Sequence, residues 1–306
     1  MSFFAILIAL VLEQVRPLAY DNPVHAGLRG WSRSVRRNFD AGQASHGWVA
    51  WLLAVALPAA VSALVYWALW RVSLVLAFAW LVLVLYLTVG FRQFSHHFSD
   101  IRQALEAGDE ALARERFAQW LRVDATTLPR SELLRQFIVH SVLAAHRHVF
   151  GVLVAFVVFW VVGLGPAGAV LYRLAEYVSR SWRQRPDGTT SEALERSALT
   201  LWRWIDHIPA RVTALGFAVV GNFEEAVAGW RSRVNAGEAG SDDVVLAAAG
   251  GAINLPLLRT PSVDLSEPLT ETPQLAHLGS VVGLVWRAVV LWMLLLALLS
   301  LARLVG

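Results

Sequence analysis

The sequence predicts an all-α, polytopic helical membrane protein with about four transmembrane helices and amphipathic helices on the cytoplasmic side. Hydrophobic residues make up 57% of the 306 residues and charged residues only 16%, whereas a soluble domain is about half apolar and a quarter charged. The apolar residues also gather in long runs free of charge. The chain has no cysteine and, since all its basic residues are arginine, no lysine, which excludes disulfides, Schiff-base chemistry and a P-loop lysine.

Two apolar runs, 48–70 and 72–91, are separated only by Arg71. Each is long enough to cross a bilayer, and one arginine makes no sizeable loop, so we expect a tight transmembrane hairpin. Pro58 in the first run is expected to kink its helix. The earlier run Phe3 to Leu12 is too short to span and should be half-inserted, re-entrant or packed on other helices.

A third apolar run, 149–171, contains Gly163, Gly165, Pro166 and Gly168 in its second half. This cluster predicts either a kinked span or a discontinuous helix. The last run, 281–301, is interrupted only by Arg287, for which snorkelling or pairing competes with a functional intramembrane charge.

Arginine content places the segments on both sides of the hairpin in the cytoplasm. An odd number of later crossings would then put 172–280 outside, against the arginine bias, so its side of the membrane stays open. The six segments expected from these patterns are 1–47 (a short apolar helix and a basic cytoplasmic segment), 48–91 (the hairpin), 92–148 (amphipathic helices), 149–182 (the broken third membrane helix), 183–280 (a polar helical and loop region) and 281–306 (the C-terminal transmembrane helix).

His146 and His148 flank Arg147 just before the third apolar run. Arginine and histidine near helix ends form a plausible anion site, for the phosphate of a ligand or of a lipid headgroup. Zinc is not favoured, because no carboxylate lies between Glu132 and Glu176 and the histidine spacing matches no metal motif. Nucleic acid is not indicated, since the net charge is only +3.

The stretch from Leu201 to Arg211 contains Asp206 and Pro209. A proline disfavours helical geometry in the residue before it, so we expect one helix to end here and another to begin at Val212. Asp206 would then cap the new helix or pair with Arg211, and a ligand-binding role for the two is the alternative.

The sequence Ile208-Pro-Ala-Arg-Val-Thr-Ala-Leu215 is followed by Gly221-Asn-Phe-Glu-Glu-Ala226 and Trp230. Earlier in the chain come Ala104-Leu-Glu-Ala-Gly-Asp109 and Gly165-Pro-Ala-Gly-Ala-Val-Leu-Tyr172. In this order these stretches resemble blocks of the membrane family that contains adenosylcobinamide-phosphate synthase (the CobD/CbiB family) and the β-lactamase-induction protein AmpE.

The chain departs from the family's enzymes in its acidic residues. Those enzymes carry an acidic Glu-Asn-x-x-Asp stretch before the third apolar run, which could hold magnesium and ATP phosphates, whereas residues 133–175 here contain no Asp or Glu. Asp206 stands in Ile-Asp-His-Ile-Pro-Ala-Arg, which is similar to the Leu-Asp-Trp-Val-Pro-Val-Arg of AmpE.

The resemblance therefore implies an AmpE-like protein of the bacterial inner membrane, non-catalytic and without cofactor, that senses or signals cell-wall turnover or β-lactamase induction. The alternative is an amide-forming ligase of cobalamin biosynthesis that uses Mg²⁺ and ATP, with a phosphate-bearing or corrinoid small molecule as partner besides the lipid bilayer. That alternative would use Arg147, Arg173 and Arg211 for phosphate and carboxylates such as Glu176, Asp206 and Glu224. A third possibility, a small transporter or lipid-binding protein, rests on the broken helix and Arg287.

Overall fold

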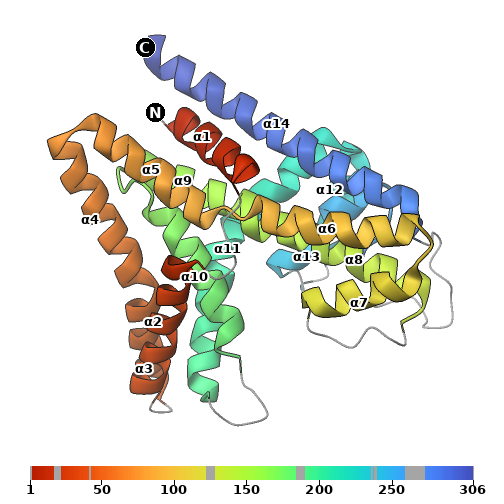
Figure 1. Ribbon diagram of the computed structural model, residues 1–306, viewed down its shortest axis with the longest axis horizontal. Helices are drawn as coiled ribbons and strands as arrows, with labels where there is room; N and C mark the ends of the chain where they lie inside the picture. Colours follow the sequence, from red (N-terminus) through yellow and green to blue (C-terminus); the bar gives the residue numbers. More distant parts are fainter. Residues whose placement is uncertain are drawn as a thin grey trace. The chain divides into compact units, whose positions relative to one another are not determined.

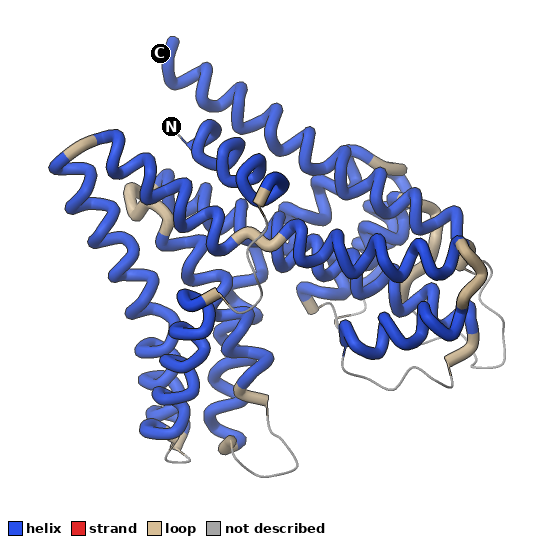
Figure 2. Tube along the Cα trace, viewed as in Figure 1, coloured by secondary structure: helices blue, strands red, loops and turns tan. Residues whose placement is uncertain are grey.

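The computed structural model describes residues 2–16, 22–40, 43–121, 128–183, 190–235, 237, 240–258 and 273–305. Every regular element within these ranges is a helix (Figure 1, Figure 2), as the sequence predicts. The chain divides into two compact units, which are described separately. Unit 1 comprises Met1–Gly90, Arg147–Pro209 and Ser300–Gly306, and unit 2 comprises Phe91–His146 and Ala210–Leu299.

Three helical stretches are long and apolar enough to cross a membrane: Ser45–Val72, Arg130–Val161 and Leu275–Ala302. The first and last of these coincide with the first and fourth expected spans. The second overlaps the third expected span, 149–171, only over 149–161, and its first part lies in the segment 92–148 that was expected to be amphipathic. The second expected span falls on a 15-residue helix, which at 1.5 Å per residue is about 22 Å long, less than the bilayer core of about 30 Å. The chain therefore contains the long apolar helices that are typical of a helical membrane protein.

The expected hairpin is present in unit 1. Helix α4 (Leu57–Val72) ends at Ser73, whose hydroxyl accepts a hydrogen bond from the Val75 amide at 3.2 Å and so begins α5 (Leu74–Thr88). Helix α1 (Ser2–Val15) packs on α5. The short apolar N-terminal run thus lies against another helix, one of the arrangements that its length predicts.

Pro58 follows a π-helical turn. Helix α3 (Ala44–Trp51) continues through the π turn η1 (Leu52–Ala56) into α4. A proline has no amide hydrogen to donate to the preceding turn, and the wider turn lies directly before it. The predicted disturbance of this helix therefore takes the form of a π turn, a feature frequent at functional sites.

The third apolar run is broken where the glycines gather. Helix α9 (Gly151–Val161) ends before Gly163 and Gly165, which have φ of +84° and +58°, and α10 (Ala167–Ser181) begins after Pro166. A side chain at Gly165 would also meet the ring of Tyr66 at 2.4 Å. Glycine is required there on both counts, because L residues with a Cβ rarely adopt this conformation.

Helix α2 (Pro23–Phe39) joins α3 and the start of α11 (Glu192–Val220) in unit 1. Its terminal Asp40 accepts a hydrogen bond from the Ser191 amide at 2.9 Å, and Arg36 donates to the Thr190 hydroxyl at 3.3 Å. Trp182, at the end of α10, donates to Ser32 at 3.2 Å. These bonds fix the basic helix α2 beside α10.

The helix boundary expected at Pro209 is wrong. Helix α11 runs without interruption from Glu192 to Val220 with Pro209 inside it. An internal proline removes one backbone hydrogen bond, but the helix continues on both sides of Pro209 despite this loss.

Unit 2 contains α6 (Phe91–Glu106), α7 (Glu110–Leu121), α8 (Arg130–Ala145), α12 (Phe223–Asn235), α13 (Ser241–Ala252) and α14 (Leu275–Val305). Helices α6 and α7 form the expected amphipathic pair, and Gly108, with φ of +78°, provides the turn between them. A side chain at Gly251 would meet the Glu225 carbonyl oxygen at 2.4 Å, so glycine permits the close contact of α13 with α12. Helix α13 lies in a region that the sequence analysis treated as polar helix and loop.

Candidate functional site

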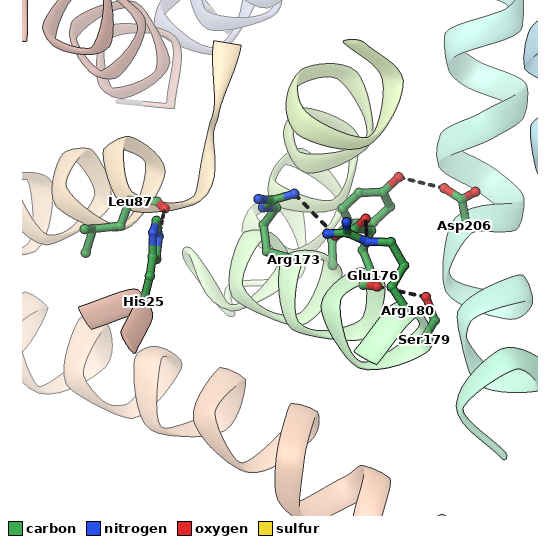
Figure 3. Close-up of polar contacts among 8 residues, drawn as sticks. His25, Leu87, Arg173, Glu176, Ser179, Arg180 and Asp206 are labelled. Carbon is green, nitrogen blue, oxygen red and sulfur yellow. Dashed lines mark hydrogen bonds and ion pairs between the residues drawn. The ribbon is translucent and has the colours of Figure 1, made fainter. Parts of the chain in front are cut away.

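The six candidate residues of the sequence analysis fall in both units. Unit 1 contains Arg147, His148, Arg173 and Asp206, and unit 2 contains His146 and Arg211. The structure brings Arg173 and Asp206 into one polar cluster on α10 and α11, which we call the α10 cluster: Tyr172, Arg173, Glu176, Arg180 and Asp206. Figure 3 shows it in close-up.

A tyrosine and a carboxylate form the buried end of the α10 cluster. The Tyr172 hydroxyl donates a hydrogen bond of 2.7 Å to Asp206 Oδ1, and both residues are fully buried. Burial and the Asp206 carboxylate raise the pKa of Tyr172 well above its ordinary value, against the opposing effect of Arg147. Tyr172 therefore stays protonated and remains a donor to Asp206.

The expected capping of a new helix by Asp206 does not occur, because α11 is continuous there, and Asp206 has a partner on α10 that the sequence analysis did not anticipate. Asp206 lies inside the continuous helix α11, where the backbone amides are already engaged in the helix. Its carboxylate oxygen Oδ1 accepts its hydrogen bond from α10. The structure thus gives Asp206 a role in joining two helices.

Gly151 makes room for the Tyr172 side chain. A Cβ atom at Gly151 would lie 2.1 Å from the Tyr172 hydroxyl and 2.2 Å from Cζ of the same ring. On another side the ring packs against Trp202, with centroids 5.1 Å apart. Gly151 begins α9 directly after the π turn η2 (His146–Phe150), which carries Arg147 and His148.

Two arginines share the single carboxylate of α10. Arg180 contacts both oxygens of Glu176, with Nε 2.6 Å from Oε1 and Nη2 3.0 Å from Oε2. Arg173 Nη1 lies farther away, 3.5 Å from Oε2. The carboxylate is almost fully buried, and Arg173 is partly exposed, so the positive charge exceeds the negative charge on this helix.

Two basic residues of α2 that the sequence analysis did not select, His25 and Arg29, add basic groups near Arg173. His25 Nε2 is 2.7 Å from the carbonyl oxygen of Leu87 at the end of α5. Burial is the largest cause of the lowered pKa of His25, and the positive charges of Arg173 and Arg29 add to it. The only signal in the sequence is the four-residue spacing of His25 and Arg29, which puts them on one face of α2.

In unit 2, His146 is buried and its Nδ1 shares a hydrogen bond of 2.9 Å with the hydroxyl of the equally buried Thr213. This contact joins the π turn η2 to α11 within that unit. Arg211 is partly exposed on α11. His148 offers its backbone carbonyl to the Gly90 amide at 3.2 Å in unit 1.

Within the described ranges, no three His, Asp or Glu side chains gather as metal ligands would. Glu176 is engaged by two arginines and Asp206 by Tyr172, while Glu224 is exposed on α12 in unit 2. These three carboxylates do not come together as a magnesium site, and we derive no step through a metal-bound nucleotide. The side chains of His96 and His97, also considered from the sequence, lie outside the described side chains.

The fold and the site together define an all-helical membrane protein with an arginine-rich polar cluster inside one of its two units. Comparison with known families identifies it further. The chain matches the family described as CobD/Cbib protein over residues 4–280. The protein belongs to this family, as the resemblance of its motifs implies.

Two curated relatives carry the same name. The chain is 29% identical to "Cobalamin biosynthesis protein CobD" of Stutzerimonas stutzeri over 263 residues, which cover 83% of this chain and 82% of the relative. It is 33% identical to the protein of that name from Chromobacterium violaceum over 207 residues, 67% of this chain and 63% of the relative. No solved structure matches the chain. The AmpE-like branch finds no support among these relatives.

Proposed function

We propose that the protein acts in cobalamin biosynthesis, at the step where a corrinoid acid is joined through an amide bond to an aminopropanol phosphate. The observation that carries this proposal is the family match over residues 4–280, together with two relatives named for cobalamin biosynthesis. It replaces the AmpE-like role as the leading interpretation. The apolar helices support a place in a membrane, and we propose the bacterial inner membrane.

The chemistry of the described residues favours binding of an anionic substrate. Arg147 acts electrostatically on Tyr172, and Arg173 shares the Glu176 carboxylate with Arg180. Guanidinium groups bind phosphate and carboxylate through parallel hydrogen bonds. An amide-forming reaction on a corrinoid acid and an amino phosphate needs groups that hold both kinds of oxyanion.

A second candidate, the AmpE-like signalling role, is favoured by one specific observation. Residues 133–175 contain no carboxylate, and the carboxylates of Glu176 and Asp206, which are buried in unit 1, are engaged by arginine and tyrosine. A protein with this arrangement could keep the scaffold without the reaction.

Genetic complementation distinguishes the two. We would express the full chain in a bacterium that lacks its cobinamide-phosphate synthase, under conditions where growth requires cobalamin synthesis. Rescue by the wild-type chain supports the biosynthetic role. Failure to rescue, with membrane expression verified by immunoblot, contradicts it and favours the signalling role.

A further inference from the structure

Three exposed tryptophans, each from a different helix, lie at one end of unit 1. Trp31 of α2, Trp48 of α3 and Trp204 of α11 are 42%, 39% and 68% exposed. The ring centroids of Trp48 and Trp204 are 6.2 Å apart. Trp31 Nε1 donates a hydrogen bond of 3.1 Å to the carbonyl oxygen of Leu53 in η1, the turn that follows α3. We call Trp31, Trp48 and Trp204 the tryptophan surface.

A second pair of tryptophans lies at the other end of the same helical stretch, where α4 turns into α5 (Figure 1). Trp67 and Trp70 are exposed, and Arg71 lies over the ring of Trp67, with its guanidinium carbon 4.4 Å from the ring centroid. Trp48 and Trp70 belong to the continuous stretch Ser45–Val72, along which they are about 33 Å apart at 1.5 Å per residue. This distance matches the bilayer core of about 30 Å, and tryptophan is enriched at both edges of that core.

The surface between the two groups of tryptophans is apolar. Helix α4 exposes Leu57, Val61 and Leu64, which their three- and four-residue spacing puts on one face. No charged residue occurs from 48 to 70. Tryptophans that are a bilayer core apart, with exposed aliphatic side chains between them, fit a lipid bilayer as the partner that covers this face.

Helix α10 brings the chain back to the end of unit 1 that carries the tryptophan surface. The turn before α10 lies near the α4–α5 hairpin, since a Cβ atom at Gly165 would be 2.4 Å from the ring of Tyr66. Helix α10 then packs on α4 and η1. Just after its last residue, Trp182 donates to Ser32, the neighbour of Trp31. The chain therefore leaves α10 beside the tryptophan surface.

This end of unit 1 is rich in arginine. Residues 22–40 and 180–204 contain nine arginines and four acidic residues, whereas Arg71 is the only charged residue from 48 to 91. Cytoplasmic segments of membrane proteins carry an excess of basic residues, so the bias favours the cytoplasmic leaflet for the tryptophan surface. Because α10 returns the chain to this end, the arginines that follow it agree with the same bias.

Two arginines lie next to the tryptophan surface on its outer side. Helix α2 ends and α11 begins close to the contact of Asp40 with the Ser191 amide. Arg33 follows the tryptophan of α2 by two residues, and Arg203 directly precedes the tryptophan of α11; both arginines are exposed. Each is therefore displaced from its tryptophan away from the hairpin turn, by about 3 Å or less at 1.5 Å per residue.

We propose that the tryptophan surface lies in the headgroup layer of the cytoplasmic leaflet, and that Arg33 and Arg203 bind the headgroups of anionic phospholipids there. An indole ring suits this layer, because its body is apolar and its N–H is polar. A guanidinium group binds a phosphate through two parallel hydrogen bonds. This lipid surface does not depend on the cobalamin role.

Single cysteines test the position in the bilayer without background, because the chain has no cysteine of its own. Nitroxide labels on S45C, V61C and W204C would be studied by EPR in nanodiscs of phosphatidylcholine and phosphatidylglycerol. Accessibility to oxygen, which gathers in the core, would be compared with accessibility to a water-soluble nickel chelate. We expect V61C to favour oxygen, S45C to favour nickel, and W204C to be accessible to both.

Two outcomes of the EPR measurement overturn the proposal. A label at W204C that is protected from both reagents would show that protein, such as a second copy of the chain, covers the tryptophan surface. A label at V61C that favours nickel would show that the face of α4 between the tryptophans is not in the core.

The leaflet is tested by labelling from each side of sealed membrane vesicles with a maleimide that does not cross the membrane. The exposed residues Arg183, just after α10, and Val72, at the hairpin turn, are the informative positions. We expect S45C and R183C to react from the cytoplasmic side and V72C to react from the opposite side. Reaction of R183C and V72C from the same side overturns the proposal.

The arginines are tested by native mass spectrometry of the full chain titrated with phosphatidylglycerol or phosphatidylcholine. We expect R33Q/R203Q to weaken the first phosphatidylglycerol adduct by about fivefold or more and to leave phosphatidylcholine binding unchanged. R37Q/R196Q is the matched control, because it removes two exposed arginines from the same two helices at positions farther from the tryptophans.

Unchanged phosphatidylglycerol binding in R33Q/R203Q, or an equal loss in R37Q/R196Q, overturns the assignment of Arg33 and Arg203. Thermal melting verifies that each variant is folded. If the double variant does not fold, R33Q and R203Q are measured singly, and each should lose part of the preference for phosphatidylglycerol.

Discussion

The Tyr172–Asp206 hydrogen bond predicts a measurable coupling between α10 and α11. Tyr172→Phe removes the hydroxyl that donates to Asp206 Oδ1 at 2.7 Å in a fully buried location. A hydrogen bond to a charged group contributes about 1.5–3 kcal/mol, and the buried carboxylate also loses a partner. Asp206 has further interactions, so its substitution alone does not measure this bond.

A double-mutant cycle isolates the bond, because effects that the two substitutions do not share cancel. We would measure the free energy of unfolding for wild type, Tyr172→Phe, Asp206→Asn and the double variant by SDS titration in mixed micelles. We expect a coupling of about 1 to 3 kcal/mol. Tyr177→Phe, on the same helix but partly exposed, should have little effect. A coupling of zero would refute the view that this pair joins the two helices.

Further predictions concern packing, hydrogen bonding and pH. Gly151→Ala should destabilise unit 1 by about 1–3 kcal/mol, because its Cβ would lie 2.1 Å from the Tyr172 hydroxyl; an unchanged melting temperature would contradict this. Thr213→Val should cost about 1 kcal/mol through loss of the 2.9 Å bond to His146, and equal stability of variant and wild type would show that the bond contributes nothing. Burial lowers the pKa of His25 in the folded protein. As pH falls below about 6.5, the ordinary pKa of histidine, the unfolded chain therefore binds a proton at His25 more readily than the folded protein does. The free energy of unfolding should decline below this pH, and less steeply in His25→Gln. Parallel pH profiles of the two proteins would be evidence against a neutral His25.

The membrane hairpin and the broken helix could be predicted from the sequence because their causes are local. A single charged residue between two apolar runs fixes the place of the hairpin turn, and Ser73 caps the second helix there. Gly163 and Gly165 supply the positive φ values that interrupt the third run. In both cases the residues whose sequence pattern predicts the feature are the same residues that produce it in the structure.

Pro209 misled the prediction because its local preference is outweighed by the surrounding helix. A proline costs a helix about 3 kcal/mol or more, yet α11 extends well beyond it on both sides. The sequence analysis described 183–280 only as a polar helical and loop region and gave no bounds for α13, because the small residues that allow close packing on α12 resemble a loop in composition.

The site was predicted in part. Arg173 and Asp206 were selected from the sequence, and both belong to the α10 cluster. Glu176, the partner of Arg173, was named from the sequence as a possible carboxylate of the site. Tyr172 and His25 were not selected, because Tyr172 acquires its role from the proximity of α11 and His25 from the proximity of α10. These contacts join residues far apart in the chain, which no single sequence pattern shows.

The central claim is that this membrane protein performs a step of cobalamin assembly. The most direct measurement is turnover by the purified, detergent-solubilised chain, supplied with a corrinoid acid, aminopropanol phosphate, Mg²⁺ and ATP, with the amide product detected by mass spectrometry. The account predicts product that depends on the protein and on every substrate. Thermal melting would verify that the protein is folded, and a cobinamide-phosphate synthase would serve as the positive control under the same conditions. If the control forms product and this protein forms none, the account is contradicted.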